Sequence, residues 1–280
     1  MSLKLGLFGL HRGSSAEPDV LARRARTAED AGFESLWVGD HIALPFDAAD
    51  PPAQPRLEAV TALAHLAALT SRVRLALGVI VLPQRQPVLL AKQLTTIDVL
   101  SKGRLIVGVG VGYVEPELRA LGASLADRGV RTDEYLGAMR ALWDEPGPAF
   151  DGRFVGFAGV LQRPRPVQRP HPPIVVGGHS PSALRRAVLA GSGWYGWELD
   201  LAGTARALDD LREASRRHGR PAELGELEIT ITPPGVPDLE TARQYAALGV
   251  HRLAIQPRTM DGSAIDDLIV TVRETLIGRV

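Results

Sequence analysis

Short apolar runs alternate along the chain with segments whose apolar residues recur at helical spacing. The runs are rich in β-branched and other apolar residues, as strands are. They lie near Leu3–Phe8, Ser35–Val38, Val73–Leu82, Leu105–Val109, Pro173–Val176, Gly193–Tyr195, Leu227–Thr232 and His251–Ile255. Alternation of this kind is typical of βα units around a parallel sheet. Eight units predict an α/β fold, a (β/α)8 TIM barrel with short insertions, forming one domain over residues 1–280. An open doubly wound sheet is the alternative.

The helical segments carry recognisable stripes and ends. Leu21, Ala25 and Ala28 share one helix face, and Gly32 follows where a C-terminal cap is expected. The other expected helices include a stripe from Tyr135 to Trp143 and segments at 204–218, 239–248 and 264–276. The insertions are the loop Ala43–Pro55 and the segment Glu145–Pro172, in which a hairpin is expected around Phe150–Leu161.

Composition narrows the classes of partner and chemistry. Lys and Arg together number 32, as do Asp and Glu, so no net charge favours nucleic acid or a membrane surface. The chain has no cysteine, which excludes thiolate catalysis and cysteine-ligated metals. Its seven histidines show no metal-binding spacing, so we expect no metal site. The longest uncharged apolar run, Leu75–Leu82, is too short to span a bilayer, and we expect a cytoplasmic protein.

The clearest candidate site is the segment from Pro172 to Ala187, because a barrel places its active site at the carboxyl ends of its strands. Gly177 and Gly178 end a buried strand and allow close approach of a ligand to the backbone. Ser180 and Pro181 then suit the N-cap and first position of a helix. Free amides at a helix start favour a phosphate. An ordinary capped turn is the alternative.

Two further strand ends carry candidate residues. Asp40 and His41 follow the strand Ser35–Val38, where an acid beside an imidazole can orient a cofactor ring or move a proton. Loop residues without a catalytic role are the alternative. Gly110 belongs to the run Gly108–Tyr113, which fails the dinucleotide pattern because Tyr113 stands where the third glycine belongs. Its glycines let backbone approach a flat ligand, or simply fit a tight strand end.

Together these segments resemble the luciferase-like monooxygenase family, particularly its branch that uses the deazaflavin coenzyme F-420. The resemblance runs from Leu3 to about Ile255. It rests on EDAGFESLWVGDH, on LALGVIVLPQRQPVLLAKQLTTIDVLSKGRLIVGVGVG, on RTDEYLGAMRALW and on PPIVVGGHSPSALRRA. The second of these, which holds some forty residues in family order, is the most specific.

The resemblance implies where a cofactor lies. It implies a ring across the strand ends, with Asp40 and His41 beside it, and a phosphate near Gly177–Pro181, a range that includes His179 and Ser180. It also implies a non-prolyl cis peptide at Ile80-Val81. The family's sugar-phosphate dehydrogenases carry a catalytic glutamate where this chain has Tyr113, so this substrate class is not expected.

The resemblance leaves three functions open. The first is hydride transfer between coenzyme F-420 and an unidentified small organic substrate, with His41 as the catalytic residue. The second is a reduced-FMN monooxygenase supplied by a separate flavin reductase. The third is a flavin-binding protein without catalysis. A homodimer is expected because proteins of this family usually pair through early helices, and the alanine-rich segment Thr61–Leu69 suits such a contact.

Overall fold

Eight parallel strands close into a barrel in the computed structural model, which describes residues 2–49, 51–260 and 262–280. The strands are β1 (Lys4–Phe8), β2 (Ser35–Val38), β3 (Arg74–Leu77), β5 (Leu105–Gly110), β8 (Ile174–Gly177), β9 (Gly193–Trp197), β10 (Glu228–Thr232) and β11 (Arg252–Ile255). Strand β3 pairs with β5, where Leu75 lies beside Leu105, and β1 pairs with β11. The ring of pairings is therefore complete, which confirms the (β/α)8 barrel and excludes the open sheet.

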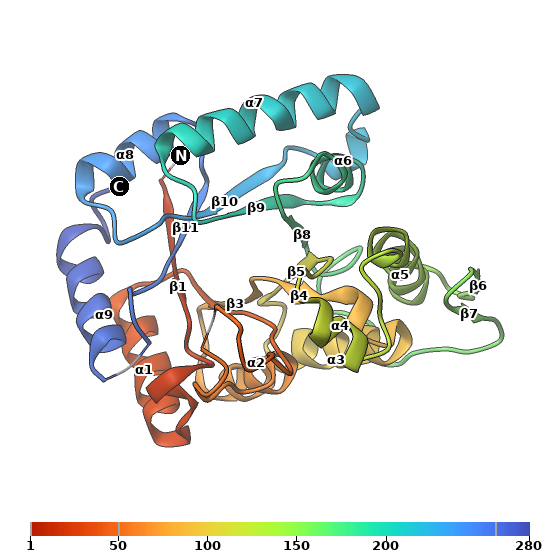
Figure 1. The fold of residues 1–280 in the computed structure, drawn as a ribbon, viewed down its shortest axis with the longest axis horizontal. Coiled ribbons are helices and arrows are strands. Elements are labelled where there is room, and N and C mark those ends of the chain that lie inside the picture. Colours follow the sequence, from red (N-terminus) through yellow and green to blue (C-terminus); the bar gives the residue numbers. More distant parts are fainter. Residues whose placement is uncertain (1, 50, 261) are drawn as a thin grey trace.

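Helices cover the outer face of the barrel (Figure 1). They are α1 (Pro18–Ala31), α2 (Ala59–Leu69), α3 (Pro87–Leu100), α5 (Arg128–Asp144), α6 (Pro181–Ala190), α7 (Leu201–His218), α8 (Leu239–Ala247) and α9 (Ala264–Thr275). Shorter elements are α4 (Glu115–Ala120), β4 (Ile80–Val81), the 3-10 turns Gly13–Ala16, Leu82–Gln84 and Ala222–Leu224, and the hairpin of β6 (Phe150–Asp151) and β7 (Gly156–Phe157). Among the described residues, no helix is both long and apolar enough to cross a bilayer.

Local sequence signals set the helix ends. Glu17 accepts hydrogen bonds from the amides of Asp19 and Val20 at the start of α1. Gly32 ends α1 with φ of 100°, a conformation that side chains disfavour, so the expected C-terminal cap is confirmed. Ser180 caps α6 by accepting a hydrogen bond from the Ala183 amide at 3.2 Å, and Pro181 takes the first helical position as expected.

Two apolar layers hold the fold together, one between the barrel and its helices and one inside the barrel. In the inner layer the Trp37 and Tyr195 rings stack with centroids 5.3 Å apart. Seven strands each contribute one buried residue to this layer, namely Phe8, Trp37, Ala76, Ile106, Val175, Tyr195 and Ala254. The amino end of the barrel is closed by the buried guanidinium of Arg252, which donates to the Glu34 carboxylate at 2.8 Å and pairs with Glu228. The buried positive charge of Arg252 is therefore paired with two carboxylates.

The third strand ends at Leu77 rather than running to Leu82 as the sequence predicted. After Gly78 the chain turns, and β4 pairs separately with the end of β5. The non-prolyl cis peptide lies at Gly78-Val79, so the prediction of Ile80-Val81 is wrong by two residues. A Cβ at Gly78 would lie 3.0 Å from the Trp37 ring and 3.2 Å from the Phe8 ring, so the turn sits where only a glycine fits comfortably.

Glycines on the neighbouring strands make room for the side chain that follows this turn. A Cβ on Gly110 or Gly177 would lie 2.6 Å and 2.9 Å, respectively, from the methyl groups of Val79. A Cβ on Gly108 would lie 1.8 Å from the Leu77 carbonyl oxygen. Side chains at these positions would therefore displace either Val79 or the backbone of β3. We call Val79 with Gly108, Gly110 and Gly177 the glycine cradle.

Gly108→Ala should destabilise the protein by about 3 kcal/mol, because the new methyl group meets backbone of β3 that cannot rotate away. Urea unfolding followed by circular dichroism measures the change in the free energy of unfolding. The control is Gly147→Ala, where a Cβ has no neighbour within 4 Å and the change should stay within about 1 kcal/mol. Equal stability of the two variants would contradict the close packing described for β3 and β5.

Candidate active site

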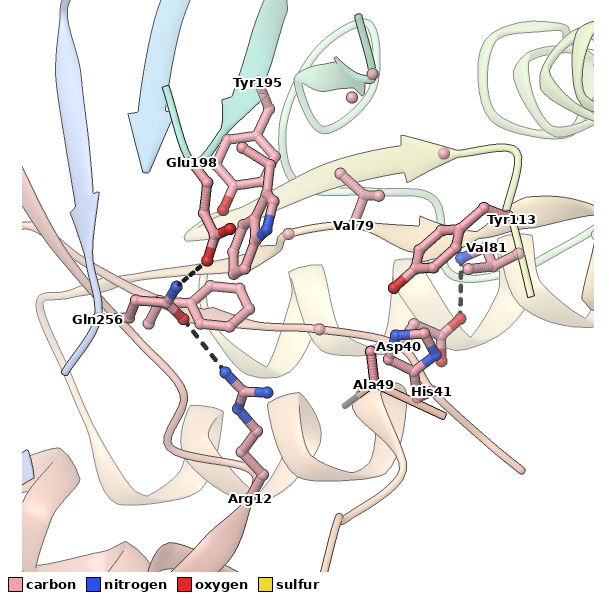
Figure 2. A pocket seen from close by; sticks show the side chains of 18 of the residues that line it. Arg12, Asp40, His41, Ala49, Val79, Val81, Tyr113, Tyr195, Glu198 and Gln256 are labelled. Atoms are coloured by element: carbon pink, nitrogen blue, oxygen red, sulfur yellow. Dashed lines mark hydrogen bonds between the residues drawn. The ribbon is translucent and has the colours of Figure 1, made fainter. Parts of the chain in front are cut away.

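A cavity of about 1070 Å³ opens at the carboxyl ends of the barrel strands. Residues that follow most of the barrel strands line it, and Figure 2 shows a group of their side chains. Its base is the inner end of the barrel, where Phe8, Val79 and Tyr195 reach the cavity. The cavity lies where the sequence analysis placed the site from the general rule for this fold.

Most of the predicted site residues line this cavity, on three of its sides. They are Asp40, His41, Val81, Gly110, Gly177, Gly178, His179 and Ser180. Ile80 is fully buried among the residues between barrel and helices, while Val79 and Val81 on either side of it line the cavity. Alternation of side chains along an extended segment accounts for this difference. Pro181 lies exposed in the first turn of α6 and is not part of the lining.

Asp40 is held by protein groups. Its Oδ2 accepts a hydrogen bond from the Val81 amide at 2.9 Å, as Figure 2 shows, and its Oδ1 accepts from Arg85. Arg85 also donates to Glu58 at 2.6 Å. Burial raises the pKa of the Asp40 carboxyl, and the charge of Arg85 offsets that effect only in part. Asp40 therefore fixes β4 beside the cavity.

His41 is tied to a buried carboxylate that the sequence analysis did not single out. Its Nδ1 lies 2.9 Å from Oε2 of Glu117, whose side chain is 1% exposed. Oε1 of Glu117 accepts hydrogen bonds from the amides of Ile42 and Ala43, at 2.5 and 3.1 Å. Burial alone would raise the pKa of Glu117, but the hydrogen bonds from His41 and the two amides outweigh it and hold the pKa below its ordinary value.

The tautomer of His41 follows from this contact. An ionised carboxylate only accepts hydrogen bonds, so Nδ1 of His41 carries the proton that it donates to Glu117. Nε2, on the other side of the ring, is left for the cavity that His41 lines. Tyr113 stands edge-on to this imidazole, with centroids 6.0 Å apart. Glu117 lies in α4, one helical turn after Tyr113, in a segment that no periodic pattern marked.

A polar chain lies across the cavity from His41 (Figure 2). Arg12 donates to Oε1 of Gln256 at 3.2 Å, and Nε2 of Gln256 donates to Glu198 at 3.3 Å. Glu198 directly follows β9 with φ of 51°, in the left-handed region that non-glycine residues seldom adopt. Such conformations cost about 1–3 kcal/mol and cluster at functional sites. The exposed carboxylate of Glu198 is thus held at the cavity mouth by its backbone and its neighbour.

The start of α6 opens on the same cavity. Gly178 has φ of 112°, and its carbonyl accepts a hydrogen bond from the Trp194 indole at 2.9 Å. His179 Nε2 accepts from the Trp197 amide at 3.2 Å, which fixes the loop to β9. The amide of Ser182, at the second helical position, has no partner within the helix and suits an anion.

The two arginines within α6 pair with another helix. Arg185 and Arg186 both pair with Asp133 of α5. Arg186 also donates to the Gly129 carbonyl at 3.1 Å, which fixes the start of α5 beside the cavity. Arg128, the first residue of α5, lines the cavity instead.

These features fit a flat cofactor with an anionic tail. The glycine cradle and the backbone of Gly110 leave a wall that a ring can approach, and a Cβ at Gly110 or Gly177 would collide with Val79. The loop Gly177–Ser180, which ends at the N-cap of α6, offers backbone donors on one side of the cavity.

Comparison with known proteins agrees with this geometry. The profile of the luciferase-like monooxygenase family matches residues 3–254. The chain belongs to this family. An uncharacterized protein of Mycobacterium tuberculosis is 33% identical over 276 residues, covering 88% of this chain and 97% of that protein. The FMNH2-dependent dimethylsulfone monooxygenase of Pseudomonas putida is 28% identical over 219 residues, covering 77% of this chain and 59% of that enzyme.

Solved structures match the barrel over its whole length. An F-420-dependent secondary alcohol dehydrogenase superposes with a TM-score of 0.80 at 18% identity and covers 99% of both chains. Members of the luciferase-like family are oxidoreductases and monooxygenases that depend on flavin or F-420, and this chain is an enzyme of that kind.

Glu117→Gln should lower stability by about 1.5–3 kcal/mol at pH 7, because the charge that accepts three hydrogen bonds is lost. The pKa of Glu117 is lower in the folded protein than its ordinary 4.5, so its stabilising effect is present above about pH 4.5 and is lost as the pH falls further. The gap between wild type and variant should therefore narrow toward acid.

Denaturant unfolding between pH 3 and pH 7 measures this gap. The matched control is Glu115→Gln, an exposed residue two positions earlier in α4, which should change stability by less than about 0.5 kcal/mol at pH 7. A gap between wild type and Glu117→Gln that stays constant across the range would contradict the ionised, hydrogen-bonded Glu117.

Proposed function

We propose that this enzyme transfers a hydride between coenzyme F-420 and a small organic substrate, with His41 moving the accompanying proton. The observation that carries the proposal is the His41–Glu117 pair at the cavity wall. Reduction of a carbonyl group by a hydride requires a proton, and oxidation of an alcohol releases one. A histidine with one nitrogen bound to a carboxylate and the other available to a ligand suits this role.

The residues that would hold the cofactor come from separate strand ends. Val79 and Gly110 would lie against the ring, and Gly177–Ser180 with the start of α6 would receive the phosphate. When bound, the deazaflavin supplies the acceptor or donor of the hydride.

The chain's own residues supply orientation and proton transfer. Glu117 holds the His41 ring in one orientation and stabilises the positive charge that the ring gains when Nε2 takes a proton. The Ile42 and Ala43 amides hold Glu117 in turn, so the proton-transfer group rests on a buried support. Asp40 keeps β4 fixed through the Val81 amide and therefore keeps the adjoining wall in place.

A second candidate is a reduced-FMN monooxygenase. The relative from Pseudomonas putida, named as FMNH2-dependent, supports it, as does the fact that FMN and F-420 both present a flat ring and a phosphate. The same residues would hold either cofactor, so the arrangement of His41 and Glu117 does not separate the two.

The partners that the enzyme needs differ between the two candidate functions. A monooxygenase of this kind needs reduced flavin from a separate flavin reductase, whereas hydride transfer with F-420 needs only the coenzyme and the substrate. The homodimer also stays a prediction. Segment Thr61–Leu69 lies within α2, where Thr61, His65 and Ala68 are exposed on the outer face.

Binding titrations with F-420 and FMN, each oxidised and reduced, decide between the candidates. We expect F-420 to bind at least tenfold more tightly than FMN, since the proposal assigns the site to the deazaflavin. Fluorescence quenching of the cofactor measures both dissociation constants on the purified protein. Tight binding of reduced FMN with no detectable F-420 binding would overturn the proposal in favour of the monooxygenase.

His41→Ala should lower turnover by about 10²–10⁴-fold, the usual contribution of general acid-base catalysis, and should change cofactor affinity much less. Steady-state kinetics with reduced F-420 and a carbonyl substrate measure the turnover number. His65→Ala, which removes an exposed histidine from α2, is the matched control and should keep wild-type kinetics. If His41→Ala loses stability or cofactor binding while its turnover is preserved, His41 serves only to pack the loop.

A further inference from the structure

A second histidine at this cavity has an unsatisfied donor. His11, which follows β1, is 4% exposed and lines the cavity. Its Nε2 accepts a hydrogen bond from the Gly39 amide at 3.2 Å, so Nε2 carries no proton and Nδ1 does. Nδ1 is buried and has no hydrogen-bond partner among the described residues.

The surroundings keep this imidazole neutral. Burial, together with the positive charges of Arg12 and Arg56, lowers the pKa of His11 to about 3. The Phe8 ring lies edge-on to the imidazole with centroids 5.9 Å apart, and Phe8 offers Nδ1 no lone pair. At neutral pH the side chain is therefore a donor at Nδ1 and an acceptor at Nε2, with those roles fixed by the Gly39 amide.

A buried donor without an acceptor is destabilising, and native structures seldom leave one unmatched. His11 escapes this cost when a bound ligand brings an oxygen atom within reach of Nδ1. Because the imidazole is neutral, it favours a polar carbonyl oxygen and the partial negative charge that grows on it. A neutral imidazole in such a position polarises a carbonyl group.

We propose that Nδ1–H of His11 donates a hydrogen bond to a carbonyl oxygen of the ligand bound in the cavity. This inference rests on the proposed function, since the ligand is either the ring of the cofactor or the substrate that reacts with it. Both present a carbonyl oxygen, and the experiment separates the two sources. His11 and His41 then divide the work, because His41 exchanges a proton while His11 only donates a hydrogen bond.

Two variants separate the proposed role from the structural one. His11→Gln places an amide oxygen where Nε2 stood, which keeps an acceptor for Gly39 but removes the donor at Nδ1. His11→Asn places an amide N–H near the Nδ1 position and loses the acceptor for Gly39. His11→Asn therefore keeps the donor and loses the hydrogen bond from the Gly39 amide. His11→Gln keeps that hydrogen bond and loses the donor.

Titration of wild type, His11→Gln and His11→Asn with F-420 and FMN tests the cofactor as the source of the oxygen. A ring carbonyl predicts binding about tenfold weaker in His11→Gln and within threefold of wild type in His11→Asn. A substrate carbonyl predicts unchanged cofactor affinity and a tenfold loss of kcat/KM in His11→Gln, with acetone or cyclohexanone and reduced F-420.

The results that would overturn the role of His11 differ from those that would overturn the proposed function. If wild type binds a cofactor and reduces a ketone while His11→Gln matches it in both measurements, the inference is wrong and the proposed function stands. Equal losses in His11→Gln and His11→Asn would assign His11 a structural role and also overturn it. Absence of any F-420 or FMN binding to wild type overturns the proposed function, and the inference with it.

A measurement on the wild-type protein covers the case in which His11→Gln does not fold. Histidine labelled with ¹⁵N reports the Nδ1 resonance of His11, which the spectrum of His11→Asn assigns by its disappearance. A shift of this resonance on adding F-420 or FMN supports the ring carbonyl, and a shift only after a ketone follows supports the substrate. An unchanged resonance in the saturated complex overturns the proposal.

Discussion

The inside of the barrel has room for few large side chains, and which residues fill it determines where the cavity begins. A barrel of eight strands is filled by the side chains that point inward. Here Trp37 and Tyr195 stack across the interior, and Gly78 leaves room for the Trp37 and Phe8 rings. On β5 and β8 glycines replace side chains, so Val79 fits against Gly110 and Gly177. The filled core thus ends at a level set by Val79, and the cavity begins above it.

Buried charges around the cavity are arranged so that each has a partner. Asp40 meets Arg85, and Glu117 meets His41 and two backbone amides. An unpaired buried charge would cost several kcal/mol, so these contacts fix the loop after β2 relative to the segments that follow β4 and β5. Removing one side chain of a pair would leave a buried charge without a partner, and the loops that carry the site would no longer be held in place.

The sequence predicted the strands and the cavity edge well because both follow local rules. Apolar runs and helix caps are read from neighbouring residues, and the carboxyl ends of the strands meet at one end of any such barrel. The cis peptide was misplaced because the break in the third strand depends on Phe8 and Trp37, which lie far away in sequence. Side chains alternate along this extended segment, so Val79 and Val81 line the cavity while Ile80 is buried on the other side.

Contacts between distant elements were beyond the reach of sequence patterns. No sequence pattern near Glu117 predicts its contact with His41, because α4 is a short helix without an apolar stripe. Arg186 pairs with Asp133 on α5, more than fifty residues away in sequence. The unsatisfied nitrogen of His11 likewise exists only because the Gly39 amide takes the other one.

The carboxylate beside His41 differs in kind from the one that Tyr113 replaces. The resemblance implies a glutamate at that position in the family's sugar-phosphate dehydrogenases, where it can meet the ligand directly. In this chain Tyr113 is largely exposed and edge-on to His41, and the acidic group comes from Glu117, whose side chain is 1% exposed. A carboxylate buried to that degree, with both oxygens bonded to protein groups, has no oxygen open to a ligand. The exposed carboxylate at the cavity is instead Glu198, across from His41, and it is held by Gln256. The carboxylate that is open to the cavity therefore lies on the wall across from His41.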